Sequence, residues 1–208
     1  MQVTLLGTGD TTGTPTVACD CPTCERARER GVERTRFSVH VTGDDGRSLL
    51  IDFSPDFRQQ LLREDVPLPD AAVVTHIHFD HLDGLGNVYR LLDSLPVYAA
   101  DETDPATGRS VAETVRERYD YLDRITVHGR TPFESFEAAG FEVTLVPVVH
   151  PPLVSYGVRI DEPATGASLA ISGDTSYAIG EDARAVLRDA DLALVEGIVH
   201  ADLCAHHP

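Results

Sequence analysis

Short apolar runs recur along the whole chain and are separated by charged or glycine-rich stretches. Apolar and polar residues alternate at 141–149, which is typical of a strand with one buried face. The runs at 71–74 and 191–196 are nearly continuous, as expected for buried strands of a parallel sheet. The patterning predicts strands at residues 1–6, 37–42, 48–53, 71–74, 96–100, 141–149, 156–160, 168–172 and 191–196.

Helices are expected between these strands. Val111, Val115 and Tyr119 are spaced by four residues and would share one helical face. The alternation of strands and helices indicates an α/β fold, and no linker divides the chain, so one domain covering 1–208 is expected. The predicted helices cover residues 25–33, 54–63, 85–92, 110–121 and 179–188.

Composition changes this picture mainly through charge. The chain has 34 acidic and 17 basic residues, a net charge of −17, and every basic residue is an arginine. An acidic surface without lysine is typical of a protein that works in concentrated salt, where screening weakens self-repulsion. The alternative is that the source organism's proteins are acidic and rich in arginine in general, without adaptation to salt. The same balance argues against a nucleic-acid partner, which would require a basic surface.

The chain shows no pattern that directs a protein to a membrane. No apolar run approaches the roughly 20 residues of a membrane span. The first six residues lack the basic start and the length of a signal peptide. We therefore expect a cytoplasmic protein with no membrane partner, and a homodimer is compatible with the sequence.

The densest cluster of metal-binding residues reads His-x-His-x-Asp-His and directly follows the predicted strand at 71–74. His76 and His78 are two residues apart, so on an extended backbone they point the same way and can share one ion. Asp80 and His81 lie where the chain must turn and can face a second ion. Imidazole and carboxylate suit Zn, Mn or Fe(II), and metal pairs about 3.5–4 Å apart recur in hydrolases. A solvated histidine-rich loop is the alternative.

Three cysteines, Cys19, Cys21 and Cys24, lie within the loop at 19–24. A chain without an export signal favours metal ligation over disulfides. Three thiolates supply three corners of a tetrahedral zinc site, which needs a fourth ligand to be closed. A reduced cluster without metal is the alternative.

The His-x-His-x-Asp-His pattern resembles that of the metallo-β-lactamase superfamily. The opening strand, the glycine turn and the cysteine cluster together resemble its PhnP-type cyclic phosphodiesterase branch. This resemblance implies a four-layered αβ/βα sandwich with two divalent metals, Zn or Mn, at the strand ends. It also implies that the cysteines bind one structural Zn, completed by a histidine near the C-terminus.

Three further residues are assigned roles in this site. The resemblance implies that His150 is the third ligand of the first metal and that Asp174 bridges both metals. Asp52 ends a predicted buried strand near the metal loop, so it is expected to orient a ligand histidine. In the superfamily the chain continues with a helix and a strand that carry one more metal-binding histidine, and this unit is expected to be missing here. Either the second metal is held more weakly, or Cys204, His206 and His207 replace the missing ligands.

The expected activity is hydrolysis of a phosphodiester in a small phosphorylated substrate, cyclic phosphates included. A metal lowers the pKa of bound water from about 15.7 to about 7, which supplies the attacking hydroxide. Asp80 and His200 are the expected catalytic residues, His200 as the general acid that protonates the leaving group. The alternative is that His200 is a surface histidine without a catalytic role.

Other functions share this set of ligands. The same hydroxide would attack a thioester or a lactone. A tRNA 3′-end endonuclease would need a basic arm that grasps RNA, and the sequence shows none. A β-lactamase is the weakest alternative within the superfamily. A non-catalytic metal-binding accessory protein of cofactor biosynthesis is the alternative from another class.

Overall fold

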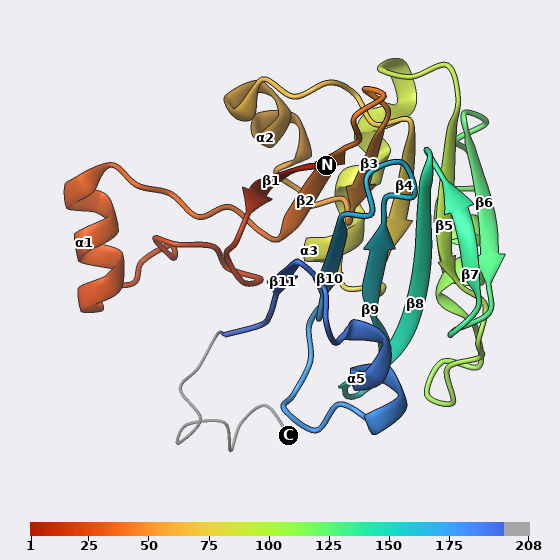
Figure 1. Ribbon diagram of the computed structural model, residues 1–208. Coiled ribbons are helices and arrows are strands. Elements are labelled where there is room, and N and C mark those ends of the chain that lie inside the picture. The colour runs from red at the N-terminus through yellow and green to blue at the C-terminus, as the bar shows by residue number, and fades with distance from the viewer. Residues whose placement is uncertain (198–208) are drawn as a thin grey trace.

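The computed structural model of the protein describes residues 1–197, and two β-sheets face each other across a common core (Figure 1). The first sheet has the strand order β1-β2-β3-β4-β5-β6. Its first three strands are antiparallel, and β3, β4, β5 and β6 run parallel. Its strands are β1 (Gln2–Gly7), β2 (Ser38–Thr42), β3 (Ser48–Ile51), β4 (Ala71–Val74), β5 (Leu95–Ala100) and β6 (Ile125–Arg130).

The second sheet has the order β11-β10-β9-β8-β7. Its pairs are antiparallel except for β10 and β11, which are parallel. Its strands are β7 (Ser135–Ala138), β8 (Phe141–His150), β9 (Leu153–Asp161), β10 (Ser168–Ile171) and β11 (Leu192–Leu194). Both sheets are therefore mixed.

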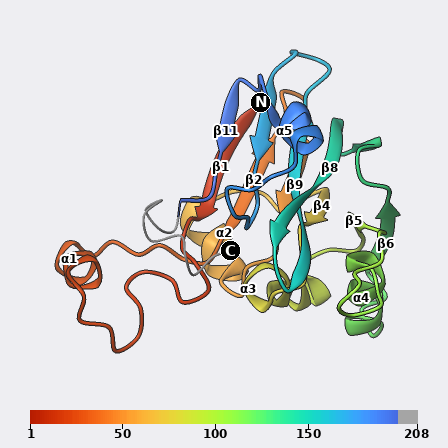
Figure 2. The same cartoon turned by 90° about the horizontal axis from the view of Figure 1, so that it is seen from below.

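Helices lie outside the two sheets, and α1 extends away from them (Figures 1 and 2). A capping box begins α4, where the Ser110 hydroxyl accepts from the Glu113 backbone N–H, and such a cap contributes about 1 kcal/mol. No helix among residues 1–197 is long and apolar enough to cross a membrane. The helices are α1 (Pro22–Arg30), α2 (Phe57–Glu64), α3 (Phe79–Leu82), the 3₁₀ helix η1 (Asp83–Arg90), α4 (Val111–Arg118) and α5 (Glu181–Leu187).

One apolar core joins the inner faces of both sheets. Leu50 and Val73 of the first sheet and Leu145 and Val158 of the second are completely buried in the same cluster. Burying one such side chain stabilises the fold by about 1.5–3 kcal/mol. The apolar residues of both the alternating and the continuous patterns are therefore buried in this core. The core fixes the ends of β4, β8 and β10 relative to one another.

The predicted α/β fold of the superfamily is confirmed, with differences in single elements. The helix expected at 85–92 is present as a 3₁₀ helix that begins at Asp83. Gly84 packs closely against the chain there, since a Cβ would lie 2.0 Å from the Ser54 carbonyl oxygen. The strand at 191–196 is shorter and not buried, since β11 pairs only with β10 among the described residues and Leu192 is exposed. Strand β7 was not predicted. The expected absence of the last unit lies outside the described residues, and the single domain stays a prediction.

Candidate metal centre

The predicted metal ligands meet at one edge of the two sheets. His76 and His78 follow β4, where the chain leaves the sheet as an extended segment. Asp80 lies in the short helix α3 beside His81. His150 is the last residue of β8 in the second sheet. The parallel strands of the first sheet and a strand end of the second thus contribute to one site.

Three histidines form the first ligand cluster. Nε2 of His76 lies 3.0 Å from Nδ1 of His78, and Nε2 of His150 lies 3.1 Å from that same Nδ1. Zinc binds imidazole nitrogen at about 2.0–2.1 Å, so two nitrogens of a tetrahedral site are about 3.3 Å apart. The observed spacing fits a shared ion.

The second cluster contains Asp80, His81 and Asp174, whose ligand atoms all lie within 4.8 Å of one another. Asp174 Oδ2 lies 3.3 Å from His81 Nε2. The same oxygen lies 4.0 Å from His76 Nε2 and 3.9 Å from His150 Nε2. One carboxylate oxygen therefore lies between the two clusters, where a bridging ligand would have to be.

A buried network fixes His81 from behind. Asp52 is completely buried, and its Oδ2 accepts from His81 Nδ1 at 2.6 Å and from the Thr75 hydroxyl at 2.7 Å. Its other oxygen accepts from the Thr75 backbone N–H at 2.8 Å. Thr75 Oγ1 also lies 3.1 Å from His76 Nδ1. The network turns Nε2 of His81 toward Asp174 and links the two ligand clusters.

The charges of the site fit divalent cations. Burial lowers the pKa of His81, but the carboxylates of Asp52 and Asp174 outweigh burial and raise that pKa to about 10. Burial raises the pKa of Asp174, but hydrogen bonding and the charge of His81 hold it well below its usual range. Burial, followed by the charge of His81, holds the pKa of His76 well below its usual range, so this imidazole is neutral and able to bind a metal.

A buried oxygen without a partner supports the same conclusion. Asp80 is only 3% exposed, and its Oδ1 has no hydrogen-bond partner among the described residues. An unpaired buried carboxylate oxygen is costly unless it pairs with a charge or coordinates a metal. His/Asp clusters of this composition suit Zn, Mn or Fe(II). The residues present therefore fit a divalent-metal centre.

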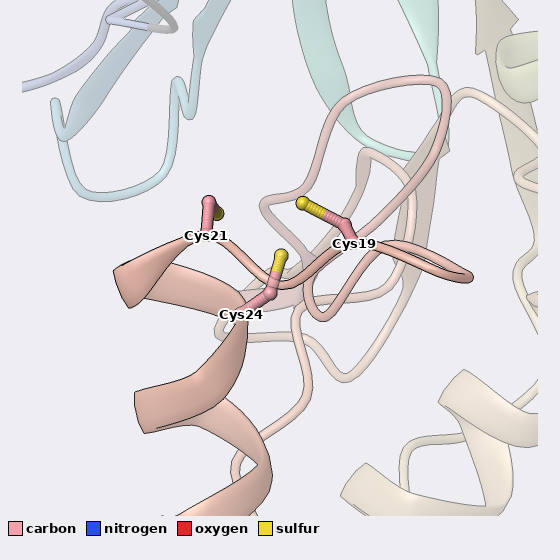
Figure 3. A group of neighbouring side chains, drawn as sticks. All are labelled: Cys19, Cys21 and Cys24. Atoms are coloured by element: carbon pink, nitrogen blue, oxygen red, sulfur yellow. The ribbon is translucent and has the colours of Figure 1, made fainter.

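The three cysteines form a separate cluster at the start of α1. Their sulfur atoms lie within 4.8 Å of one another and turn toward one common space (Figure 3). The Cys24 backbone N–H, followed by the neighbouring thiols, lowers the pKa of Cys21 to about 7. Thiolate is the metal-binding form of cysteine, so this cluster is suited to a soft cation near neutral pH. Three sulfurs leave one tetrahedral position open for a fourth ligand.

A cavity of about 620 Å³ adjoins the second ligand cluster. His81 and Asp174 lie in its wall, together with Arg34 and parts of the loop after β1. The loop also touches the site directly, because the Thr11 hydroxyl donates to Asp80 Oδ2 at 2.8 Å.

Sequence reasoning missed Thr11, Thr75 and Arg34. Thr75 directly precedes the histidine pattern, so its position was a signal for a supporting role. Thr11 is 69 residues away from Asp80 and gave no such signal. His40 and His128 lie in β2 and β6, outside both ligand clusters. The predictions for His200, Cys204, His206 and His207 lie outside the described residues.

Comparisons with known proteins give the family. The sequence profile of the beta-lactamase superfamily domain matches residues 47–207. A Porphyromonas gingivalis protein named octanoyltransferase is 35% identical over 79% of this chain, and this chain spans 34% of that protein.

Two solved structures share the fold over most of the chain. A diphosphatase of the PhnP family is 32% identical with a TM-score of 0.74, covering 92% of this chain and 71% of that one. Zn²⁺-bound PqqB from Methylobacterium extorquens is 25% identical with a TM-score of 0.79, covering 95% of this chain and 73% of that one. The chain therefore belongs to the beta-lactamase superfamily and, within it, resembles the PhnP-type branch.

Proposed function

We propose that the protein is a metal-dependent hydrolase that cleaves a phosphodiester bond in a small phosphorylated substrate, with cyclic phosphates in its range. The single observation that carries this proposal is the position of Asp174 Oδ2 between two ligand clusters. A metal pair sharing one bridging carboxylate is a recurring device for displacing an oxygen from phosphorus.

Each side chain of the site has a defined task in this reaction. His76, His78 and His150 would hold one divalent metal, Zn or Mn, and Asp80 and His81 the other, with Asp174 between them. When bound, such metals supply a hydroxide at neutral pH and neutralise charge on phosphate oxygens. Asp52 and Thr75 keep His81 in one ring orientation, and outer partners of this kind commonly change metal affinity or activity by about 10–100-fold.

One of the similar proteins supports phosphorus chemistry without specifying the substrate. The PhnP-family neighbour is described as a diphosphatase. The cavity beside His81 and Asp174 has room for a small organic phosphate, since ligand pockets commonly measure about 300–1,000 Å³. The proposed setting is cytoplasmic and of high salt, consistent with the net charge of −17. Zn in the cysteine cluster and a homodimer belong to the same proposal.

Metal content and turnover together test the proposal. We expect two or three metals per chain, and His81→Ala should lose one metal and reduce cleavage of a bis-aryl phosphate by on the order of 100-fold. His128→Ala is the control, because His128 stacks on Tyr98 away from both clusters. One metal per chain, unchanged in His81→Ala and without turnover, would overturn the proposal.

The substrate class needs a second comparison. Since the same hydroxide attacks carbonyls, an aryl thioester and a lactone should be tested beside the bis-aryl phosphate. Faster turnover of the thioester would favour the carbonyl alternative. A tRNA precursor would test the endonuclease alternative.

An accessory role in cofactor biosynthesis is the second candidate, since the chain is also similar to proteins named coenzyme PQQ synthesis protein B. It predicts metal in the cysteine cluster, a half-filled histidine site and no turnover of any of these substrates.

A further inference from the structure

Three arginines surround a hollow beside the metal-site cavity. Arg26 and Arg30 are four residues apart and lie on one face of α1, while Arg34 follows the helix in sequence. The hollow measures about 350 Å³. Its wall also contains the apolar residues Pro22, Ala27 and Val32. It combines a small apolar wall with three guanidinium groups.

Within residues 1–197 these arginines lack an acidic partner. Among the described residues, none of the three forms an ion pair, whereas Arg28 of the same helix pairs with Asp20 at 3.3 Å. Among the described residues, the one side-chain hydrogen bond of the three is from Arg34 Nη2 to the Thr14 hydroxyl at 3.4 Å. The acidic residues of α1, Glu25 and Glu29, do not line the hollow. In a chain of net charge −17, three converging cations without carboxylates form a local positive surface.

The hollow and the cavity of the metal centre share part of their walls. Thr14 and Arg34 line both. The larger cavity also contains His81 and Asp174. A ligand with one phosphate at the metal centre could therefore place another group against the arginines.

We propose that Arg26, Arg30 and Arg34 form a subsite for a second phosphate group of the substrate, remote from the bond that is cleaved. This proposal deepens the phosphodiesterase function proposed above and rests on it. Guanidinium groups pair with phosphate oxygens by charge-assisted, often bidentate hydrogen bonds. Pro22, Ala27 and Val32 would contact the carbon body between the two phosphates. The substrate class is thus an organic phosphate that carries a phosphodiester and a further phosphate.

Two substrates with the same scissile bond test this subsite. One is an aryl ester of a nucleoside 5′-phosphate, and the other is the same ester with an additional 3′-phosphate. In the metal-loaded wild-type protein the 3′-phosphate should lower KM. Arg26→Gln/Arg30→Gln should raise KM for the bisphosphate by roughly tenfold and leave kcat/KM for the monophosphate within about twofold. The matched control is Arg58→Gln/Arg90→Gln, which removes the same charge from exposed positions outside the hollow.

A binding measurement separates this proposal from the proposed activity. Calorimetric titration with a nucleoside 3′,5′-bisphosphate and with the 5′-monophosphate gives two Kd values. The informative quantity is the Kd of the monophosphate divided by the Kd of the bisphosphate. This ratio should fall about tenfold in Arg26→Gln/Arg30→Gln and stay unchanged in the control variant. Absence of turnover together with this tenfold fall of the ratio would overturn the phosphodiesterase and leave a phosphate-binding site. Equal ratios in wild type and variant, or equal losses on both substrates, would overturn the subsite.

Discussion

The histidine loop and the cysteine loop both gather metal ligands, but the fold supports them in different ways. His76 and His81 are 0% and 1% exposed, and their orientation is fixed by side chains of the core edge. Cys21 is exposed and Cys19 half-buried. The histidine loop is held by the two sheets, whereas the cysteine loop lies largely outside them, and a metal bound there would add to its order.

The difference follows from how each loop is attached. The histidine loop follows the central strand β4. It is hydrogen-bonded to the segment after the neighbouring strand β3, because the Phe53 backbone N–H donates to the His81 carbonyl at 2.7 Å. The segment that carries the cysteines meets the sheet region through isolated bridges between Gly9 and Arg36 and between Thr14 and Arg34. Few buried contacts and short bridges are the features of segments that open locally.

Asp52→Ala should have the largest effect, because it removes the support of the histidine loop. The Thr75 backbone N–H and His81 Nδ1 would lose their buried acceptor. Removing one partner from a buried charged pair costs about 3–5 kcal/mol. We expect the free energy of unfolding in urea to fall by that amount and metal affinity to fall about 10–100-fold. Asp52→Asn, which keeps the shape and one acceptor oxygen, should lie between wild type and Asp52→Ala. An unchanged urea midpoint in Asp52→Ala would contradict the comparison.

Gly84→Ala should have the next largest effect. A Cβ at Gly84 would lie 2.0 Å from the Ser54 carbonyl oxygen and 2.8 Å from that of Phe53, so backbone must move. Inserting an atom into a packed region costs about 1–3 kcal/mol. Gly86→Ala is the matched control, because its new Cβ would meet side-chain atoms no nearer than 3.8 Å. Thermal unfolding of both variants measures the difference, and equal midpoints would contradict the close packing of this loop.

The contrast also explains which parts of the site could be predicted from sequence. His76, His78, Asp80 and His81 are adjacent in sequence, so strand periodicity alone places them together. The resemblance to the superfamily pattern then predicted two further ligands, His150 and Asp174, which periodicity alone could not predict. The site roles of these residues stay predictions, although the structure brings them together.

Other features depend on distant contacts that no local pattern records. Thr11 approaches Asp80 only because β1 and β4 share a sheet. The close approach of Gly84 to the chain at Phe53 and Ser54 joins segments that are far apart in the sequence. The exposure of Leu192 depends on β11 having one partner strand among the described residues. Sequence periodicity fixes which face of a strand is apolar, but not which neighbours cover it.

Thr11→Val tests the link between the two regions and should have a smaller effect. The Thr11 hydroxyl bonds to Asp80, and Thr12 and Thr16 of the same loop are joined by hydroxyls 3.0 Å apart. Valine keeps the shape and removes the bond, so affinity for the second metal should fall about three- to tenfold, as expected for one hydrogen bond. Thr126→Val, at an exposed position of β6, is the control. Metal titration in which both variants match wild type would show that the loop does not support Asp80.

Cys24→Ser should change the stability of the two-sheet core least. The Thr16 backbone N–H donates to Cys24 Sγ at 3.3 Å, so the substitution loosens the segment around the cysteines. One metal per chain should be lost, and limited proteolysis should cleave between residues 10 and 31 faster. The main thermal transition should shift by less than about 2–4 °C, since a segment with few buried contacts opens without the core. Thr23→Ser is the neighbouring control. A shift as large as that of Asp52→Ala would mean that the cysteine loop and the histidine loop unfold as one unit, and the distinction between them would be lost.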